Sequence, residues 1–232
     1  MRREKMIWRI GLIGFGNVGQ GFVRILAEKE RILKERYGFQ FKLIGIVDPV
    51  KGNAYNEDGI VLKEVIRLLD EKGDIKDYTG IKELDAFTLI NDPNIDIMVE
   101  VTPTNLETGE PGLTHIKKAL EKGKHVVTSN KGPIALAYKE LRDIARRRNV
   151  LLRFEGTVLS GTPAINLVKE ALAGCELESM MGILNGTTNF ILTKMEEGMS
   201  YNEALKKAQE LGYAEADPTG DVEGLDALGK VV

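Results

Sequence analysis

Cysteine, histidine and long apolar runs are all scarce in this chain of 232 residues. The one cysteine, Cys175, cannot form a disulfide within the chain, which fits a reducing, cytoplasmic compartment. The two histidines, His115 and His125, lack cysteine or acidic partners at ligand spacing, so a transition-metal site is not expected. No run approaches the roughly 20 apolar residues that cross a bilayer, so no membrane partner is expected.

An excess of basic residues is also lacking. The chain has 32 lysine and arginine residues against 35 acidic ones, a net charge of -3, which does not suggest a nucleic-acid binder. Hydrophobic residues make up 43% and charged residues 29%, as in ordinary globular proteins. The length allows one large domain or two modest ones.

Short apolar runs alternate with amphipathic stretches along the first two thirds of the chain. This order predicts βαβ units and therefore an α/β fold with a parallel sheet. The expected strands are residues 6–13, 41–47, 95–101, 124–128 and 150–154, and the expected helices are residues 17–36, 58–70, 113–122 and 135–147.

The pattern changes near Glu155, so we expect one domain over residues 1–154 and another over 155–232. The second part is predicted to be α+β, with helices and one longer strand, Glu176–Leu184. Lys230, Val231 and Val232 end the sequence without a cap or a glycine stop, as in the middle of a helix. This predicts that the second domain is truncated at its C-terminus.

A G-x-G-x-x-G pattern spans residues 14–19, directly after the first expected strand. Gly14 allows a tight turn, Gly16 lets the backbone approach a pyrophosphate, and Gly19 allows the helix to pack closely on the strand. The amides of Asn17 and Val18, at the start of the helix, then face the phosphates. The first domain is therefore predicted to be a Rossmann domain that binds NAD or NADP.

Asp48 ends the second expected strand, where an acidic residue commonly binds the ribose hydroxyls and favours NAD. The same residue, before Pro49, is also typical of a simple turn. Lys51 follows closely and suits a 2′-phosphate instead. The sequence therefore leaves the choice between NAD and NADP open.

Further candidates follow the third and fourth strands, whose carboxyl ends line the ligand crevice of a parallel sheet. Thr102 and Thr104 are candidate ligands for the ribose or nicotinamide, although Thr104 equally suits a turn. Lys131 follows the fourth strand, where the nicotinamide and the substrate are expected to meet. A solvated loop lysine is the alternative at this position.

These segments and several later ones together resemble the homoserine dehydrogenases. The resemblance covers nearly the whole chain, and the last three of its matching segments, in this order, are the specific ones. The resemblance implies reduction of L-aspartate 4-semialdehyde to L-homoserine with NAD(P)H, in threonine and methionine synthesis. The matching segments are residues 11–19, 127–131, 155–163, 182–189, 212–218 and 221–230.

Asp226 and Lys230 are four residues apart, so they are neighbours on one face of the last expected helix. Spacing alone is more typical of a surface salt bridge. The resemblance, however, implies that Lys230 donates a proton to the reduced carbonyl and that Asp226 orients the lysine or the substrate. It also implies that Lys131 helps to bind the reacting end.

The acidic loop before this helix resembles the family's substrate site. Glu215 matches the ligand of the substrate amine, and Asp221 is a second candidate. Without the resemblance, these carboxylates are typical of a solvated loop. Gly186 and Thr187 open a helix in a glycine-rich segment, whose amides suit the substrate carboxylate or carbonyl oxygen.

The resemblance also implies a monovalent cation site, with Na⁺ as the expected ion, and a homodimer formed by the second domain. The expected cation ligands are Glu155, Val158, Ser160 and Thr162.

Two other functions remain open at this point. A related semialdehyde-reducing Rossmann enzyme is one, although Cys175 lacks the histidine context that a catalytic cysteine requires. An NAD(P)-binding regulatory domain is the other, although Lys131, Asp226 and Lys230 are all present.

Overall fold

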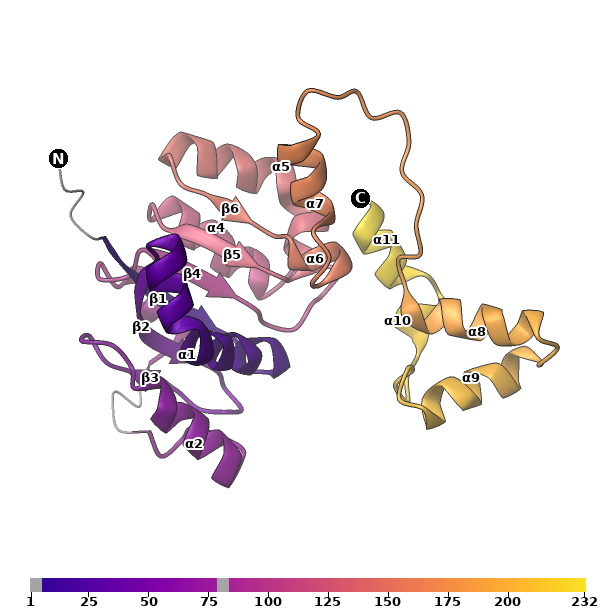
Figure 1. Cartoon of the computed structure of the whole chain (residues 1–232), viewed down its shortest axis with the longest axis horizontal. Helices are drawn as coiled ribbons and strands as arrows, with labels where there is room; N and C mark the ends of the chain where they lie inside the picture. The colour runs from indigo at the N-terminus through magenta and orange to yellow at the C-terminus, as the bar shows by residue number, and fades with distance from the viewer. Residues whose placement is uncertain (1–5, 79–83) are drawn as a thin grey trace. The chain divides into compact units, whose positions relative to one another are not determined.

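The chain is divided into two compact units, Met1–Phe154 and Glu155–Val232. Our computed structural model describes residues 6–78 and 84–232, and Figure 1 labels their helices and strands. Within these residues, no helix is long and apolar enough to cross a membrane.

A six-stranded sheet forms the centre of the first unit, with the strand order β3-β2-β1-β4-β5-β6. All neighbouring strands are parallel except β3, which pairs antiparallel with β2 at the edge. This confirms the predicted α/β fold of the Rossmann type. The strands are β1 (Ile7–Ile13), β2 (Gln40–Val47), β3 (Ala54–Tyr55), β4 (Ile97–Glu100), β5 (His125–Thr128) and β6 (Leu152–Arg153).

Helices cover both faces of this sheet, because alternate strand residues point to opposite sides. On β1, Ile10 and Leu12 pack in one cluster with helices α1 and α2, whereas Ile13 packs in the other with α3, α4 and α5. The helices are α1 (Asn17–Tyr37), α2 (Leu62–Lys72), α3 (Ala86–Asn91), α4 (Gly112–Glu121) and α5 (Lys131–Arg148).

Helix α5 differs from its prediction at its N-terminus. It begins at Lys131 instead of Ala135 and has a kink at Ala137. Pro133 lies in the first turn, where a proline is compatible with a helix because its missing N–H has no partner there anyway. Lys131 is therefore the first residue of a helix and not part of a loop.

The order of the strands defines where a ligand binds in this sheet. Strand β1 is flanked by β2 on one side and β4 on the other. The chain therefore adds β2 and β3 on one side of β1, and then β4, β5 and β6 on the other side. Such a switch point opens a crevice beyond the carboxyl ends of the two central strands. Gly14 follows the end of β1, and Thr102 follows the end of β4.

The described residues of the second unit form helices and irregular segments. Its small core is made by Ile191 of α8, Ala204 and Ala208 of α9, and Ala214. Ser200 caps α9 in a reciprocal arrangement with Glu203. The elements are α6 (Gly156–Leu159), α7 (Ala164–Asn166), the π-helical turn η1 (Leu167–Ala171), α8 (Gly186–Glu196), α9 (Tyr201–Glu210), α10 (Thr219–Val222) and α11 (Leu225–Val231).

The predicted strand Glu176–Leu184 is wrong for this chain, because the segment has neither helix nor strand. Its apolar side chains are exposed, with Met180 at 77% and Met181 at 98%. A strand is stable only when its N–H and C=O groups pair with another strand. The described residues of this unit offer none.

Candidate functional site

The three glycines of the loop between β1 and α1 have different surroundings. Gly14 has a positive φ of 96°, and a Cβ at this position would lie 2.6 Å from the carbonyl oxygen of Val101. A Cβ on Gly19 would lie 2.3 Å from the carbonyl oxygen of Gly14. Around Gly16, by contrast, nothing lies within 4 Å of such an atom. Two glycines thus permit close packing, and the middle one leaves room for a ligand, as the fingerprint predicts.

Helix α1 has no acidic side chain of its own at its N-terminus. Gly16 is its N-cap and provides no side-chain hydrogen bond, and the first turn contains no acidic residue. The first amides of a helix have no partner inside the helix, and the helix dipole favours an anion there. The amides near Asn17 and Val18 therefore suit a pyrophosphate.

Asp48 lies directly beside this glycine loop. Its carboxylate accepts hydrogen bonds from the amides of Phe15 (2.6 Å), Val50 (2.9 Å) and Lys51 (2.8 Å). The Nζ of Lys51 instead donates to the carbonyl oxygen of Gly73, after helix α2, at 2.8 Å. Of these two predicted residues, Asp48 is therefore fixed at the loop, and the ammonium of Lys51 is held at the end of α2.

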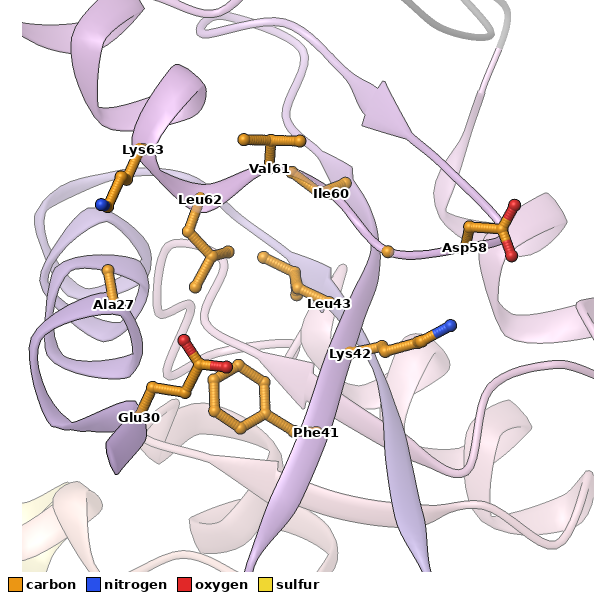
Figure 2. A pocket seen from close by; sticks show the side chains of 11 residues that line it. Ala27, Glu30, Phe41, Lys42, Leu43, Asp58, Ile60, Val61, Leu62 and Lys63 are labelled. Carbon is orange, nitrogen blue, oxygen red and sulfur yellow. The ribbon is translucent and has the colours of Figure 1, made fainter. Parts of the chain in front are cut away.

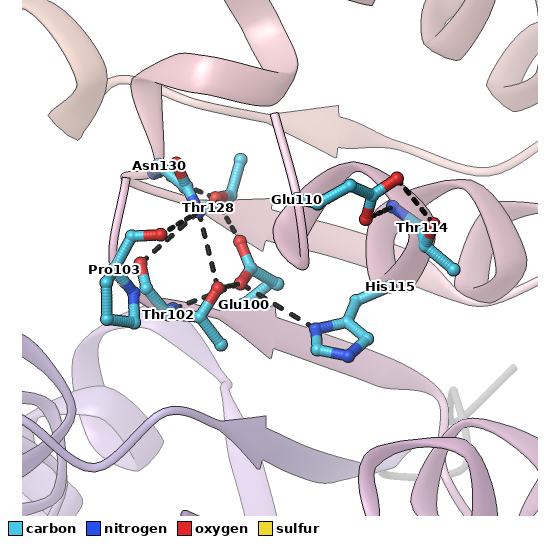
Figure 3. A network of polar contacts seen from close by, with 8 residues as sticks. All are labelled: Glu100, Thr102, Pro103, Glu110, Thr114, His115, Thr128 and Asn130. Carbon is cyan, nitrogen blue, oxygen red and sulfur yellow. Dashed lines mark hydrogen bonds and ion pairs between the residues drawn. The ribbon is translucent and has the colours of Figure 1, made fainter. Parts of the chain in front are cut away.

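A buried polar network lies at the carboxyl ends of β4 and β5 (Figure 3). Glu100, at the end of β4, is only 1% exposed. Its Oε1 accepts from the amide of Thr102 at 3.0 Å and also from the hydroxyl of Thr102. Its Oε2 accepts from the hydroxyl of Thr128 at 3.2 Å. One carboxyl group therefore joins the ends of two neighbouring strands.

Asn130 extends this network to the residue that precedes Lys131. Its amide N–H donates to the hydroxyl of Thr128 at 2.9 Å, and its Nδ2 donates to the carbonyl oxygen of Thr102 at 3.2 Å. The start of helix α5 is thereby tied to the segment after β4. Thr104, the other predicted threonine, is exposed and forms no hydrogen bond to the described residues.

His115 of helix α4 packs against the same network. Its Nδ1 is buried without a hydrogen bond to the described residues, 4.0 Å from Oε1 of Glu100. Burial lowers the pKa of His115 below its usual 6.5 and raises the pKa of Glu100 above its usual 4.5. We did not predict Glu100 or Asn130 as site residues, because their role depends on burial between strands, which spacing does not show.

In the second unit, Asp226 and Lys230 form a shielded ion pair on α11. The Nζ of Lys230 lies 2.5 Å from Oδ2 of Asp226, and the two side chains are only 14% and 20% exposed. The same Nζ donates to the carbonyl oxygen of Leu184 at 2.5 Å. The predicted neighbours therefore meet, and their shielding differs from that of a surface salt bridge.

The predicted substrate residues of this unit have different surroundings. Asp221 accepts a hydrogen bond from Nδ2 of Asn185 at 2.7 Å, whereas Glu215 is exposed. Gly186 is open to solvent, with nothing within 4 Å of a Cβ. The hydroxyl of Thr187 donates to the carbonyl oxygen of Tyr213 at 2.7 Å, so it holds the acidic loop against helix α8.

The predicted cation ligands lie around helices α6 and α7. Both carboxylate oxygens of Glu155 accept backbone amides, from Ile165 at 2.9 Å and from Asn166 at 2.8 Å. The carbonyl oxygen of Thr162 accepts from the amide of Ala164 at 2.9 Å. Val158 lies within α6, and Ser160 follows it with a φ of 51°. The oxygens of Glu155 and Thr162 thus accept local hydrogen bonds, and the Na⁺ site stays a prediction.

A separate cavity of about 250 Å³ lies in the first unit between α1, the start of β2 and residues 58–63 (Figure 2). Phe41, Lys42 and Leu43 line it from β2. The glycine loop lies at the opposite, carboxyl end of the parallel strands. This cavity is therefore not part of the predicted cofactor site.

Both units match models of a known protein family. Residues 14–155 match the family model described as "Homoserine dehydrogenase, NAD binding domain". Residues 163–232 match the one described as "Homoserine dehydrogenase". The chain belongs to the homoserine dehydrogenase family.

Individual homoserine dehydrogenases align with nearly the whole chain. The chain is 48% identical to that of Methanocaldococcus jannaschii, over 95% of this chain and 66% of the relative. It is 46% identical to the "NAD(+)-dependent homoserine dehydrogenase" of Pseudomonas canavaninivorans, over 97% of this chain and 64% of that protein. The chain thus spans just under two thirds of the length of these relatives.

Solved structures of the family agree with the fold. A hyperthermophilic archaeal homoserine dehydrogenase in complex with NADPH matches with a TM-score of 0.82 and 33% identity, covering 97% of this chain and 67% of that one. The enzyme of Thiobacillus denitrificans matches with a TM-score of 0.78 and 33% identity, covering 97% and 47%. The family relation supports NAD(P) binding by the first unit.

Proposed function

We propose that this chain contains the cofactor-binding and catalytic residues of a homoserine dehydrogenase that reduces L-aspartate 4-semialdehyde to L-homoserine, in threonine and methionine biosynthesis. The observation that carries the proposal is the shielded pair of Asp226 and Lys230, in a chain of this family. Its first domain, residues 1–154, binds NAD(P), and its second, 155–232, binds the substrate.

The geometry of this pair supports the chemistry that we propose for it. A bound reduced nicotinamide supplies the hydride that adds to the aldehyde carbon. The carbonyl oxygen then gains negative charge and needs a proton, which the ammonium of Lys230 donates. Asp226 holds that ammonium in place at 2.5 Å. Lys131, at the positive N-terminus of helix α5, assists in binding the reacting end.

The acidic side chains of the second unit complete the substrate site. Glu215 and Asp221 carry negative charge that complements the α-ammonium group of the substrate. The exposed start of helix α8 at Gly186, next to Thr187, complements its carboxylate.

We infer that NAD is preferred to NADP. The carboxylate of Asp48 is fixed beside the glycine loop, where it accepts ribose hydroxyls and repels a 2′-phosphate. Lys51, the cation that would favour NADP, is bound to Gly73. The ratio of kcat/KM for the two cofactors tests this inference. A ratio that favours NADP would contradict it, and Lys51→Ala is expected to leave the ratio nearly unchanged.

Two further properties come from the family resemblance. We propose that the protein is a cytoplasmic homodimer and that Na⁺ stabilises the turn from Glu155 to Thr162, without taking part in the reaction. Light scattering tests the dimer. Melting temperatures in sodium and in tetramethylammonium chloride test the ion, and equal values would contradict a stabilising Na⁺ site.

Oxidation of homoserine is the direct test of the proposed activity. The purified chain is mixed with L-homoserine and either NAD or NADP, and formation of the reduced nicotinamide is followed by its absorbance. We expect turnover with at least one cofactor. Binding of NAD(P)H in a fluorescence titration, without turnover, would contradict the proposal and favour a regulatory NAD(P)-binding domain.

A further inference from the structure

Asn185 has an amide side chain whose two ends have different partners. It is the N-cap of helix α8, and its side chain is buried. Its Oδ1 accepts from the amide of Thr188 at 2.8 Å and from the hydroxyl of Thr188 at 3.0 Å. The cap therefore fixes which end of the amide faces the helix.

The other end of this amide faces two carboxylates. Nδ2 of Asn185 donates to Oδ1 of Asp221 at 2.7 Å and to Oδ2 of Asp226 at 2.9 Å. An amide nitrogen has two hydrogens, so both are used. The flipped orientation would turn Oδ1 towards two carboxylates and lose the cap, so the network allows only one orientation.

The same cluster fixes Lys230. Oδ2 of Asp226 accepts hydrogen bonds from Nδ2 of Asn185 and from Nζ of Lys230. The same Nζ also donates a hydrogen bond to the carbonyl oxygen of Leu184. Consecutive residues, Leu184 and Asn185, thus hold both members of the ion pair. The charged groups that the described contacts bring together here are Asp221, Asp226 and Lys230.

We propose that Asn185 is a positioning residue for the proton-transfer pair: its amide holds Asp226 against Lys230 and shares a hydrogen bond with Asp221. This inference rests on the proposed function. The amide is a neutral donor between two like charges, so it reduces their repulsion without neutralising Lys230 as a third acid would. Asp221 keeps its second oxygen for the substrate ammonium.

A simple role as a helix cap is the competing explanation, and Asn185→Ser separates the two. Serine is as good an N-cap as asparagine but is too short to reach both carboxylates. We expect Asn185→Ser to melt close to the wild type. We expect its kcat for homoserine oxidation to fall about 10-fold or more, with a smaller change in the KM for the cofactor.

The pH profile gives a second readout that a cap alone would not move. Without the donor, the carboxylate of Asp226 keeps more negative charge and attracts the ammonium of Lys230 more strongly. Homoserine oxidation requires that lysine to accept a proton. The rising limb of kcat against pH should therefore move to higher pH, by roughly half a unit or more. Asn185→Asp, which keeps the cap and adds a third carboxylate, should move it further.

A measurement without turnover keeps this proposal separate from the proposed activity. The surroundings of Lys230 are compared by NMR in the full chain with ¹³C-methylated lysines, for the wild type and both variants. We expect the methyl resonance of Lys230 to change in Asn185→Ser and in Asn185→Asp, because both substitutions alter the carboxylate that holds its ammonium. Asn202→Ser, an exposed asparagine on helix α9, is the matched control and should change nothing.

The outcomes are distinct. A wild-type chain that binds cofactor but does not oxidise homoserine contradicts the proposed function. A Lys230 resonance and a pH profile that are the same in the wild type and in Asn185→Ser and Asn185→Asp overturn the positioning role, whatever the activity.

Discussion

Lys230 and Lys206 form the same kind of ion pair in different surroundings. Lys230 follows Asp226 by four residues on helix α11, and Lys206 precedes Glu210 by four residues on helix α9. The side chains of Lys206 and Glu210, however, are 77% and 64% exposed, and their charged atoms are 4.0 Å apart. Exposed ion pairs of this kind contribute little to the stability of a protein. Lys206→Ala is therefore a suitable control for Lys230→Ala.

We expect Lys230→Ala to reduce kcat for homoserine oxidation on the order of 10²- to 10⁴-fold, because it removes the proton-transfer group. The Kd for NAD(P)H should stay close to that of the wild type, since the glycine loop is in the other unit. Steady-state kinetics and fluorescence titration measure the two quantities. Normal turnover of Lys230→Ala would disprove its assigned role, and Lys206→Ala should behave as the wild type.

The buried pair of His115 and Glu100 predicts two opposite effects of pH on stability. Burial lowers the pKa of His115, so the folded state loses stability as the pH falls below about 6.5. Burial raises the pKa of Glu100 in the folded state, so the folded state is destabilised relative to the unfolded state as the pH rises above about 4.5. This loss of stability is complete once the pH has passed the pKa of Glu100 in the folded state.

Melting temperatures of two variants separate these effects. His115→Gln should gain stability relative to the wild type as the pH is lowered from about 7 to about 5. The melting temperature of Glu100→Gln should rise relative to that of the wild type as the pH is raised. Parallel melting curves for a variant and the wild type at every pH would exclude titration of that residue in the folded protein.

At the scale of an element, the turn from β1 into α1 allows a matched pair of alanine substitutions. Gly19→Ala places a methyl group 2.3 Å from the carbonyl oxygen of Gly14, so helix α1 must shift. We expect a loss of about 1–3 kcal/mol in the free energy of unfolding. Gly16→Ala meets no atom and should cost less than about 1 kcal/mol.

For cofactor binding, Gly16→Ala should have a larger effect than it has on stability. The methyl group of Gly16→Ala occupies the space that a pyrophosphate approaches, so we expect the Kd for NAD(P)H to rise about 10-fold or more. Denaturant unfolding and fluorescence titration measure the two effects. Equal losses of stability in both variants would contradict the distinction between packing and ligand access.

Elements with strong local patterns could be predicted from the sequence, and elements that depend on distant partners could not. The apolar runs of β1, β2, β4 and β5 are local signals, and these four strands were predicted correctly. The short helix α3 was missed, although Asp85 caps it through the amide of Thr88. The network around Glu100 requires two strands to meet, which no spacing along the chain indicates.

At the scale of the whole molecule, the exposed segment 176–184 predicts where a protease cuts first. Its apolar residues include Leu177 and Met181, and it has no helix or strand to protect the backbone. We expect limited chymotrypsin digestion to cut there before it cuts either unit's core. Trypsin is the control, because the segment contains no lysine or arginine. Mass spectrometry identifies the fragments, and a first chymotryptic cut inside the sheet would contradict the prediction.

The contacts of Asp48 have a consequence for any attempt to change the cofactor preference. The carboxylate that is proposed to select NAD also accepts three amides, including that of Phe15 in the glycine loop. Replacing it to admit a 2′-phosphate would remove the acceptor that shapes the loop under the pyrophosphate. A change of cofactor preference at this position therefore requires a compensating change in the loop, because the side chain that is proposed to select the cofactor also holds the loop in place.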